Sequence, residues 1–75
     1  MATRTLDTKG LNCPLPVLKA RKAIKDLGPG DTLEVLSTDP SSVEDFEAFC
    51  HTTGNELLES AGEEGVFRFL IRVRA

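Results

Sequence analysis

Residues 11–36, which read LNCPLPVLKARKAIKDLGPGDTLEVL, indicate a helix that is followed by a strand. Pro14 favours a helix start, because a proline in the first helical turn sacrifices no hydrogen bond. The run Gly28-Pro29-Gly30 ends the helix. We therefore predict a helix from Pro14 to about Leu27. Its core-facing side chains recur at helical spacing and are Val17, Ala20, Ile24 and Leu27.

Strands are predicted on both sides of this helix. Residues 4–7, RTLD, are expected to form a short first strand. Residues 32–38, TLEVLST, are expected to form the second strand. In that strand Leu33 and Val35 face inward and Glu34 faces outward, because successive side chains alternate between the two faces of a sheet.

A second helix is expected after Asp39-Pro40. Ser41 with Glu44 three residues later fits a capping box, in which two side chains satisfy free backbone N–H groups. Gly54 ends this helix. Its core face is expected to hold Val43, Phe46, Cys50 and Thr53, with Phe49 at the edge.

Two further strands are predicted near the end of the sequence. Residues 56–60, ELLES, form the third strand, and residues 62–65 form a hairpin loop. Residues 66–74 alternate in character, which indicates one buried face and one wet face. The inward set is Phe67, Phe69, Ile71 and Val73, and the outward set is Arg68, Leu70, Arg72 and Arg74.

The order β-α-β-α-β-β predicts an α+β fold. We expect a two-layer α/β sandwich with two helices on one face of a four-stranded mixed sheet. The chain has 75 residues, so we expect a single domain, residues 1–75.

Composition excludes several classes of function. No apolar run approaches the roughly 20 residues of a membrane span, and no secretory signal is visible. Two cysteines without an export signal suggest a reducing compartment, so we expect a cytoplasmic location. A net charge of −3 argues against stable nucleic-acid binding.

Cys13 lies directly before the first helix. The partial positive charge of a helix N-terminus favours a thiolate, so we expect a modest lowering of the pKa of the Cys13 thiol. Pro14 and Pro16 fix the backbone of the first turn, and the N–H of Leu15 between them is a possible donor to the sulfur. We therefore predict an exposed and mildly activated sulfur.

The exposed side of the first helix carries two apolar side chains among cations. Leu15 and Leu18 lie beside Arg21, Lys22 and Lys25 on a helical wheel. We interpret this face as a docking surface for a partner with acidic residues, with a plain solvated face as the alternative.

No catalytic base or metal site is predicted beside Cys13. His51 is interpreted as a solvated residue of the second helix and not as a base. Cys13, Cys50 and His51 are too few and badly spaced for zinc, so neither a metal nor a cofactor is expected. Cys50 is interpreted as a core residue, with a disulfide or resolving role toward Cys13 as the minority alternative.

Asp39 and the arginines have two interpretations each. Asp39 either only begins the second helix or also belongs to the Cys13 site, since the first two strands end close together in this topology. Arg68, Arg72 and Arg74, with Arg4, are interpreted as a solvated or partner-facing outer sheet surface. A phosphate-binding role is the alternative, which the inward aromatic side chains disfavour.

Several motifs occur together at fixed spacing. The motif G-L-x-C-P-x-P is formed by Gly10, Leu11, Cys13, Pro14 and Pro16. It is followed by the basic pair Arg21-Lys22, P-G-x-x-L at residues 29–33, D-P at Asp39-Pro40, and FRFLIRV at residues 67–73. From about Leu6 to Val73 the chain resembles the TusA family of sulfur-carrier proteins, also called SirA/YedF-like.

The resemblance implies a role for Cys13. It implies that this cysteine accepts sulfur as a persulfide from a cysteine desulfurase or a rhodanese-type donor. A downstream relay protein then receives the sulfur for tRNA thiolation, cofactor sulfuration or sulfur oxidation. Family contacts to the desulfurase match Leu18, Arg21 and Asp39. With the exposed helix face, the predicted partner-binding set is Leu15, Leu18, Arg21, Lys22 and Asp39.

The sequence is also compatible with other partners and other functions. The family branch that serves tRNA thiolation often has large apolar residues where Thr52 and Thr53 stand here, which leaves the identity of the partner open. The alternative function is a non-catalytic regulatory or interaction module that binds a partner through the Cys13 helix face. A redox pair of Cys13 with Cys50 is a weaker alternative, and we expect a monomer.

Overall fold

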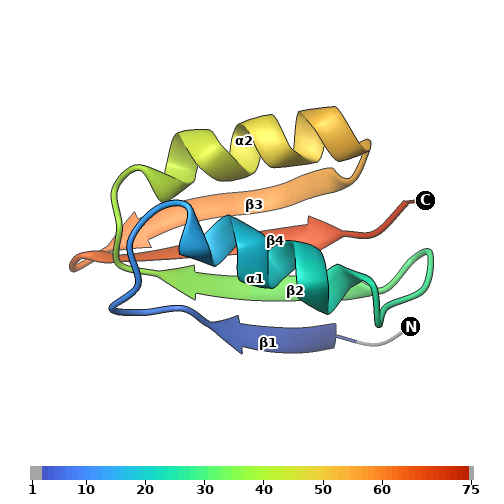
Figure 1. The fold of residues 1–75 in the computed structure, drawn as a ribbon, viewed down its shortest axis with the longest axis horizontal. Coiled ribbons are helices and arrows are strands. Elements are labelled where there is room, and N and C mark those ends of the chain that lie inside the picture. The colour runs from blue at the N-terminus through green and yellow to red at the C-terminus, as the bar shows by residue number, and fades with distance from the viewer. Residues whose placement is uncertain (1–2, 75) are drawn as a thin grey trace.

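A computed structural model describes residues 3–74 and has the predicted order of elements. They are β1 Thr3–Asp7, α1 Leu15–Ile24, β2 Thr32–Ser37, α2 Ser42–Thr53, β3 Glu56–Glu63 and β4 Val66–Arg72. The strands form one sheet in the order β1-β2-β4-β3, in which β1 is parallel to β2 and β4 is antiparallel to both its neighbours. Both helices cover one face of this sheet (Figure 1). The predicted two-layer α+β sandwich is therefore confirmed.

The core lies between the helices and the inner face of the sheet. Leu33 and Val35 are fully buried there, as predicted from their alternation with Glu34. The ring of Phe46 stacks on that of Phe69 with 4.7 Å between centroids, which fastens α2 to β4. Other buried apolar members of this cluster are Ala20, Ala23, Phe49, Cys50 and Ile71. The predicted core position of Cys50 is thus confirmed.

The first helix is shorter than predicted at both ends. Pro14 is its N-cap, so the helix begins at Leu15. Beyond Ile24 the backbone tightens, because the N–H groups of Asp26 and Leu27 bond to carbonyls three residues earlier. Leu27 still packs against the core, so the predicted apolar face extends past the regular helix.

Two details predicted for α2 are wrong. Ser41 makes no side-chain capping bond, so no capping box forms. The Asp39 carboxylate accepts the Ser41 N–H instead, at 3.0 Å, and takes over the capping role. Thr53 is exposed, not in the core, and its hydroxyl donates to the carbonyl of Phe49. Gly54 ends the helix as predicted, at a left-handed φ of 78°.

The hairpin at the end of the chain is tighter than predicted. β3 continues to Glu63, and only Glu64 and Gly65 connect it to β4. Both residues have positive φ, 52° and 81°, which suits the primed turns of two-residue hairpins. A bulge at Leu57–Glu59 turns Leu58 outward, where it is 39% exposed.

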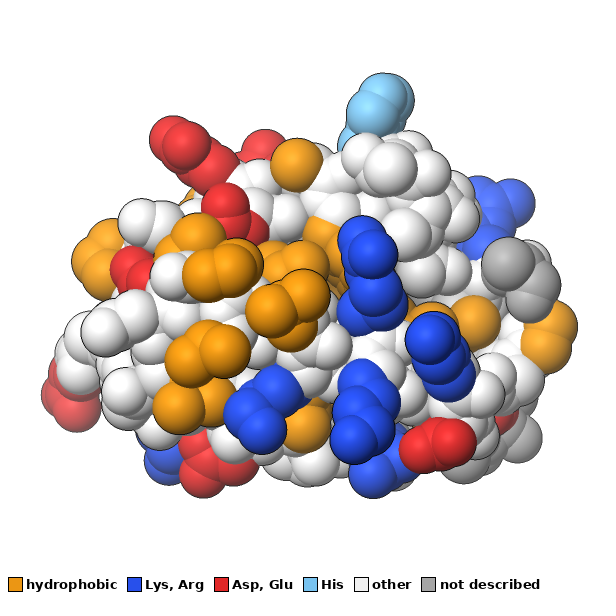
Figure 2. All heavy atoms as spheres, in the orientation of Figure 1, with side chains coloured by type: hydrophobic (Ala, Val, Ile, Leu, Met, Phe, Trp, Pro, Cys, Tyr) orange, Lys and Arg blue, Asp and Glu red, His pale blue; other side chains and the backbone are white. Residues whose placement is uncertain are grey.

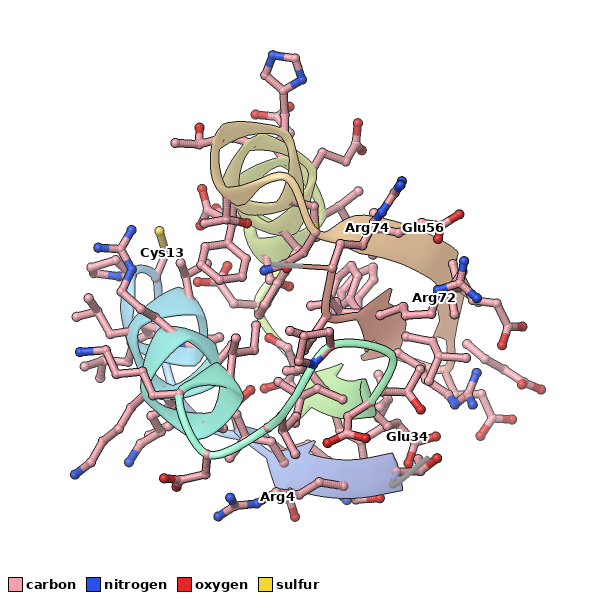
Figure 3. The ribbon with its side chains drawn as sticks, turned by 90° about the vertical axis from the view of Figure 1, so that its right-hand side faces the viewer. Arg4, Cys13, Glu34, Glu56, Arg72 and Arg74 are labelled. Carbon is pink, nitrogen blue, oxygen red and sulfur yellow. The ribbon has the colours of Figure 1, made fainter. Side chains whose placement is uncertain are left out.

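The outer sheet face carries paired charges. Arg68 bonds to Glu34 and Glu59, and Arg72 bonds to Glu56 at 2.7 Å. These pairs reduce the positive charge that the predicted arginine surface offers. Arg4 was expected on this face but lies on the helix side, where it pairs with Asp26 at 3.5 Å (Figure 3). The reason is the register, since Arg4 is paired with the inward-facing Leu33 in the parallel ladder.

We predict that Phe46→Ala strongly destabilises the protein. The side chain is fully buried between Phe49 and Phe69, and such truncations cost about 3–5 kcal/mol. A chain of this length has a free energy of unfolding of about 4–11 kcal/mol in total. Urea unfolding followed by circular dichroism measures the loss. Leu58→Ala, at an exposed site, serves as the control, and equal losses in both variants would contradict this account of the core.

Candidate functional site

The site lies at the end of the sheet where the C-terminal ends of β1 and β2 lie side by side. Because these strands are parallel, the loop into α1 and the loop into α2 leave from the same edge (Figure 1). Gly10 turns the first loop, and its φ of 86° is one that residues with a side chain rarely adopt. Its N–H donates to Thr38 Oγ1 at 2.9 Å, which attaches this loop to the one that follows β2.

Asp39 joins the two loops more directly. Its Oδ2 atom accepts the backbone N–H of Cys13 at 2.6 Å, and its Oδ1 atom accepts that of Ser41. These bonds favour the ionised form, so they lower the pKa of the Asp39 carboxyl below its usual value. The sequence left open whether Asp39 lies near Cys13. The structure brings the two together and also uses Asp39 to begin α2.

The prolines on either side of Leu15 differ in their environment. The Cys13–Pro14 peptide bond is cis, and Pro14 is exposed. Pro16 is fully buried and contributes to packing under the first turn. The N–H of Leu15 donates to the carbonyl of Asn12 at 2.9 Å. It therefore does not donate to the sulfur, and that expectation was wrong.

Cys13 is exposed beside a groove between the two helices (Figure 3). The groove has a volume of about 230 Å³ and is lined by Val17 and Arg21 from α1 and by Asp45, Ala48 and Phe49 from α2. The guanidinium of Arg21 lies 5.9 Å from the centre of the Phe49 ring, a cation–π distance. His51 is exposed on α2 and does not line the groove, so the structure does not bring it to Cys13.

The thiol is not activated in the way the sequence predicted. The Sγ–H of Cys13 donates to Asp45 Oδ2. This bond, with the nearby charges of Asp45 and Asp39, raises the pKa of the thiol above its ordinary value. Two full negative charges outweigh the partial charge of the helix end, where Pro14 and Pro16 also supply no N–H groups. Cys13 is therefore held as a thiol and not as a thiolate.

Asp45 was missed from the sequence. It lies in the first turn of α2, where an acidic residue is ordinarily explained by the helix dipole alone. The available signal was topological. Two helices that follow parallel neighbouring strands start at the same edge, so the first turn of each can face the other.

The predicted docking face is exposed. Leu15 is 44% exposed and Leu18 is 51% exposed, and Arg21 and Lys22 are exposed beside them. Figure 2 shows this mixture, with hydrophobic side chains gathered over the start of α1 and Lys and Arg side chains along the rest of that helix. Asp and Glu side chains lie on the other side of the apolar area, over the start of α2.

No group of three or more potential metal ligands occurs among residues 3–74. Both cysteines are free, and burial raises the pKa of Cys50 to about 11. Neither described helix is long and apolar enough to cross a membrane. Cys13 is the exposed cysteine of the described structure, and Cys50 is the buried one.

We predict that Asp39→Ala loosens the loop before α1. The substitution removes the acceptor of the Cys13 and Ser41 N–H groups. Amide hydrogen exchange of Cys13, followed by NMR, should become faster than in the wild-type protein. Glu47→Ala, an exposed acidic residue of α2, is the control and should leave this exchange unchanged. Unchanged exchange in Asp39→Ala would show that the carboxylate does not hold the loop.

The lowered pKa of Asp39 also predicts a dependence on pH. The folded-state pKa lies below the unfolded one, so the stabilisation is present at neutral pH and is lost as the pH falls through the folded value. Asp39→Ala should therefore reduce the acid-induced loss of stability in urea unfolding between pH 7 and pH 3. An acid dependence equal to that of the wild-type protein would contradict this.

Known proteins resemble this chain over nearly its whole length. Residues 4–73 match the family described as Sulfurtransferase TusA. The Sulfur carrier protein TusA of Allochromatium vinosum is 55% identical over 67 residues, which cover 89% of this chain and 88% of that protein. A putative sulfur carrier protein of Neisseria meningitidis is 47% identical over 72 residues, 96% of this chain and 97% of that protein.

A solved structure agrees with the fold. The crystal structure of the SirA-like protein from Desulfitobacterium hafniense superimposes with a TM-score of 0.84 at 28% identity, covering 96% of this chain and 99% of that one. The order of elements, the motif around Cys13 and these relatives agree with one another. The chain belongs to the TusA family of sulfur-carrier proteins.

Proposed function

We propose that Cys13 carries sulfur as a persulfide. The observation that carries the proposal is the exposed sulfur of Cys13, which lies in a groove next to the start of α1. The exposed face of α1 is apolar and cationic. A partner that docks on this face can bring its own cysteine to the groove. Relatives that are named sulfur carriers support the same role.

The transfer itself is a thiol–persulfide exchange. The Cys13 thiolate attacks the outer sulfur of a donor persulfide, and a new S–S bond forms as the donor's S–S bond breaks. The electron pair leaves on the donor thiolate, which takes up the proton that Cys13 gave up. Donor persulfide and Cys13 thiol thus become donor thiol and Cys13 persulfide, and no oxidant is consumed. Delivery repeats the exchange with an acceptor thiol.

The donor we propose is a cysteine desulfurase or a rhodanese-type protein. Leu15, Leu18, Arg21, Lys22 and Asp39 would contact it, because apolar contact and cationic charge favour a partner with an acidic rim. The acceptor is a relay protein for tRNA thiolation, cofactor sulfuration or sulfur oxidation. We propose that the carrier acts as a cytoplasmic monomer.

We predict that the protein gains one sulfur atom on Cys13. Intact-protein mass spectrometry after incubation with a cysteine desulfurase, pyridoxal phosphate and L-cysteine measures the gain. The added mass should disappear with dithiothreitol and be absent from Cys13→Ser. Cys50→Ala is the matched control and should still load, because Cys50 is buried. If neither a desulfurase nor a rhodanese adds sulfur to the protein, the proposal is contradicted.

The exposed apolar face also allows a second candidate, a non-catalytic interaction module. Leu15 and Leu18 would then bind a partner whether or not Cys13 is present. Partner binding that survives Cys13→Ser, together with no loading of the wild-type protein by any donor, would favour this function over sulfur transfer.

We predict that Leu18→Ser weakens binding of the sulfur donor. Loss of a central apolar contact reduces the binding free energy by about 1–2 kcal/mol, which lowers the affinity about five- to thirtyfold. Isothermal titration calorimetry with the desulfurase measures this. Leu58→Ser, which alters an exposed leucine on β3, is the control and should bind normally. Equal losses in both variants, or none in either, would remove Leu18 from the interface.

A further inference from the structure

Asp45 is the side chain that contacts the sulfur of Cys13. Its Oδ2 atom accepts a hydrogen bond from the thiol, and its side chain lines the groove between α1 and α2. The residue is half-buried in the first turn of α2, whereas Cys13 belongs to the loop before α1. The contact therefore bridges the two helix starts and fixes the direction of the Cys13 side chain.

Three charged groups belong to the surroundings of Cys13, each from a different segment of the chain. Asp45 faces it from α2, Asp39 lies at the loop after β2, and Arg21 lines the same groove from α1. Within residues 3–74, Arg21 contacts the Phe49 ring and forms no ion pair with either carboxylate. The environment of the sulfur is thus negative on balance, and a thiolate formed there would meet two carboxylates.

We propose that Asp45 restrains Cys13 in the free carrier. By accepting the hydrogen bond from the thiol, it keeps the sulfur protonated and turned toward the groove, so that unbound protein reacts slowly with small electrophiles. Asp45 is then a positioning residue for sulfur transfer. This inference rests on the proposed persulfide role of Cys13 and adds a restraint on when that cysteine reacts.

The restraint suits a carrier for a simple chemical reason. A free thiolate at the surface reacts with small oxidants and electrophiles, whereas a thiol does so far more slowly. During exchange with a donor persulfide, the proton that Cys13 gives up passes to the donor thiolate that leaves, so that atoms and charge balance.

The test is the pH profile of Cys13 alkylation by iodoacetamide. Intact-protein mass spectrometry gives the rate between pH 6 and pH 11 for the wild-type protein and Asp45→Asn. In the variant the midpoint should move to lower pH, because a neutral amide no longer opposes the thiolate. Each pH unit of movement raises the thiolate fraction at pH 7 about tenfold. For each such unit the nucleophilicity of the Cys13 thiolate falls about threefold, so the net rate of alkylation at pH 7 rises about threefold.

Glu44→Gln is the matched control. Glu44 lies in the same helical turn and loses the same charge, but it does not line the groove. Its alkylation midpoint should stay close to that of the wild-type protein, and Asp45→Glu, which keeps a carboxylate, should restore much of the restraint. Circular dichroism confirms that each variant folds. A midpoint in Asp45→Asn equal to that of the wild-type protein, or an equal movement in Glu44→Gln, would overturn the proposal.

Sulfur loading separates this inference from the proposed function. The wild-type protein and Asp45→Asn are each incubated with the desulfurase, and mass spectrometry follows the gain of sulfur. Loading of both with identical alkylation profiles rejects the restraint and leaves the carrier role standing. Faster alkylation of Asp45→Asn, with no loading of the wild-type protein by the desulfurase or by a rhodanese, rejects the carrier role and leaves the restraint intact.

Discussion

The backbone of Leu6 pairs with that of Val35 in a parallel ladder that joins β1 to β2 from Thr3↔Thr32 to Asp7↔Leu36. Every later feature of the site depends on this pairing. Parallel neighbours end at the same edge of a sheet, so both helices must start there. The loop that holds Cys13 and the loop that holds Asp39 are thereby brought within hydrogen-bond distance.

Two carboxylates at this edge have different tasks. Asp39 accepts backbone N–H groups from both loops, which makes it a structural link with a lowered pKa. Asp45 accepts a hydrogen bond from the Cys13 thiol, and this bond is the largest cause of the raised pKa of the thiol. Asp39 therefore holds the loop in place, and Asp45 stabilises the protonated form of the Cys13 sulfur that this loop carries.

The charges around the groove also give the proposed docking surface a direction. Cationic side chains follow α1 away from Cys13, whereas acidic side chains gather over the start of α2 (Figure 2). Hydrophobic side chains lie between these two groups in the same view (Figure 2). A partner with the opposite arrangement of charges would be oriented as it binds, because electrostatic complementarity fixes register more than it adds affinity.

Much of the fold could be predicted from local patterns. Alternation placed Leu33 and Val35 inward, and helical spacing together with Gly54 placed α2 correctly. Arg4 and Thr53 were misplaced, because an edge strand and a last helical turn have too few neighbouring apolar residues to fix their faces. Strand and helix ends also moved by a few residues, since tertiary pairing extends or shortens what local signals begin.

The site was predictable where it is local and not where it depends on packing. The exposure of Cys13, Leu15 and Leu18 follows from the sequence near one helix start. The protonation of Cys13 depends on Asp45, which lies 32 residues away in the chain. A prediction based on the helix dipole alone therefore gave the wrong direction for the pKa shift of the Cys13 thiol.

Following one sulfur atom through the carrier tests the proposed role of Cys13. The protein is loaded with a desulfurase and ³⁵S-labelled cysteine, separated from the donor, and mixed with a rhodanese whose active-site cysteine is free, since thiol–persulfide exchange is reversible and such a cysteine can also accept sulfur. We expect label to leave Cys13 and to appear on the rhodanese cysteine without added reductant. Label that stays on Cys13, or that is released only as sulfide, would contradict the view that this cysteine hands sulfur on.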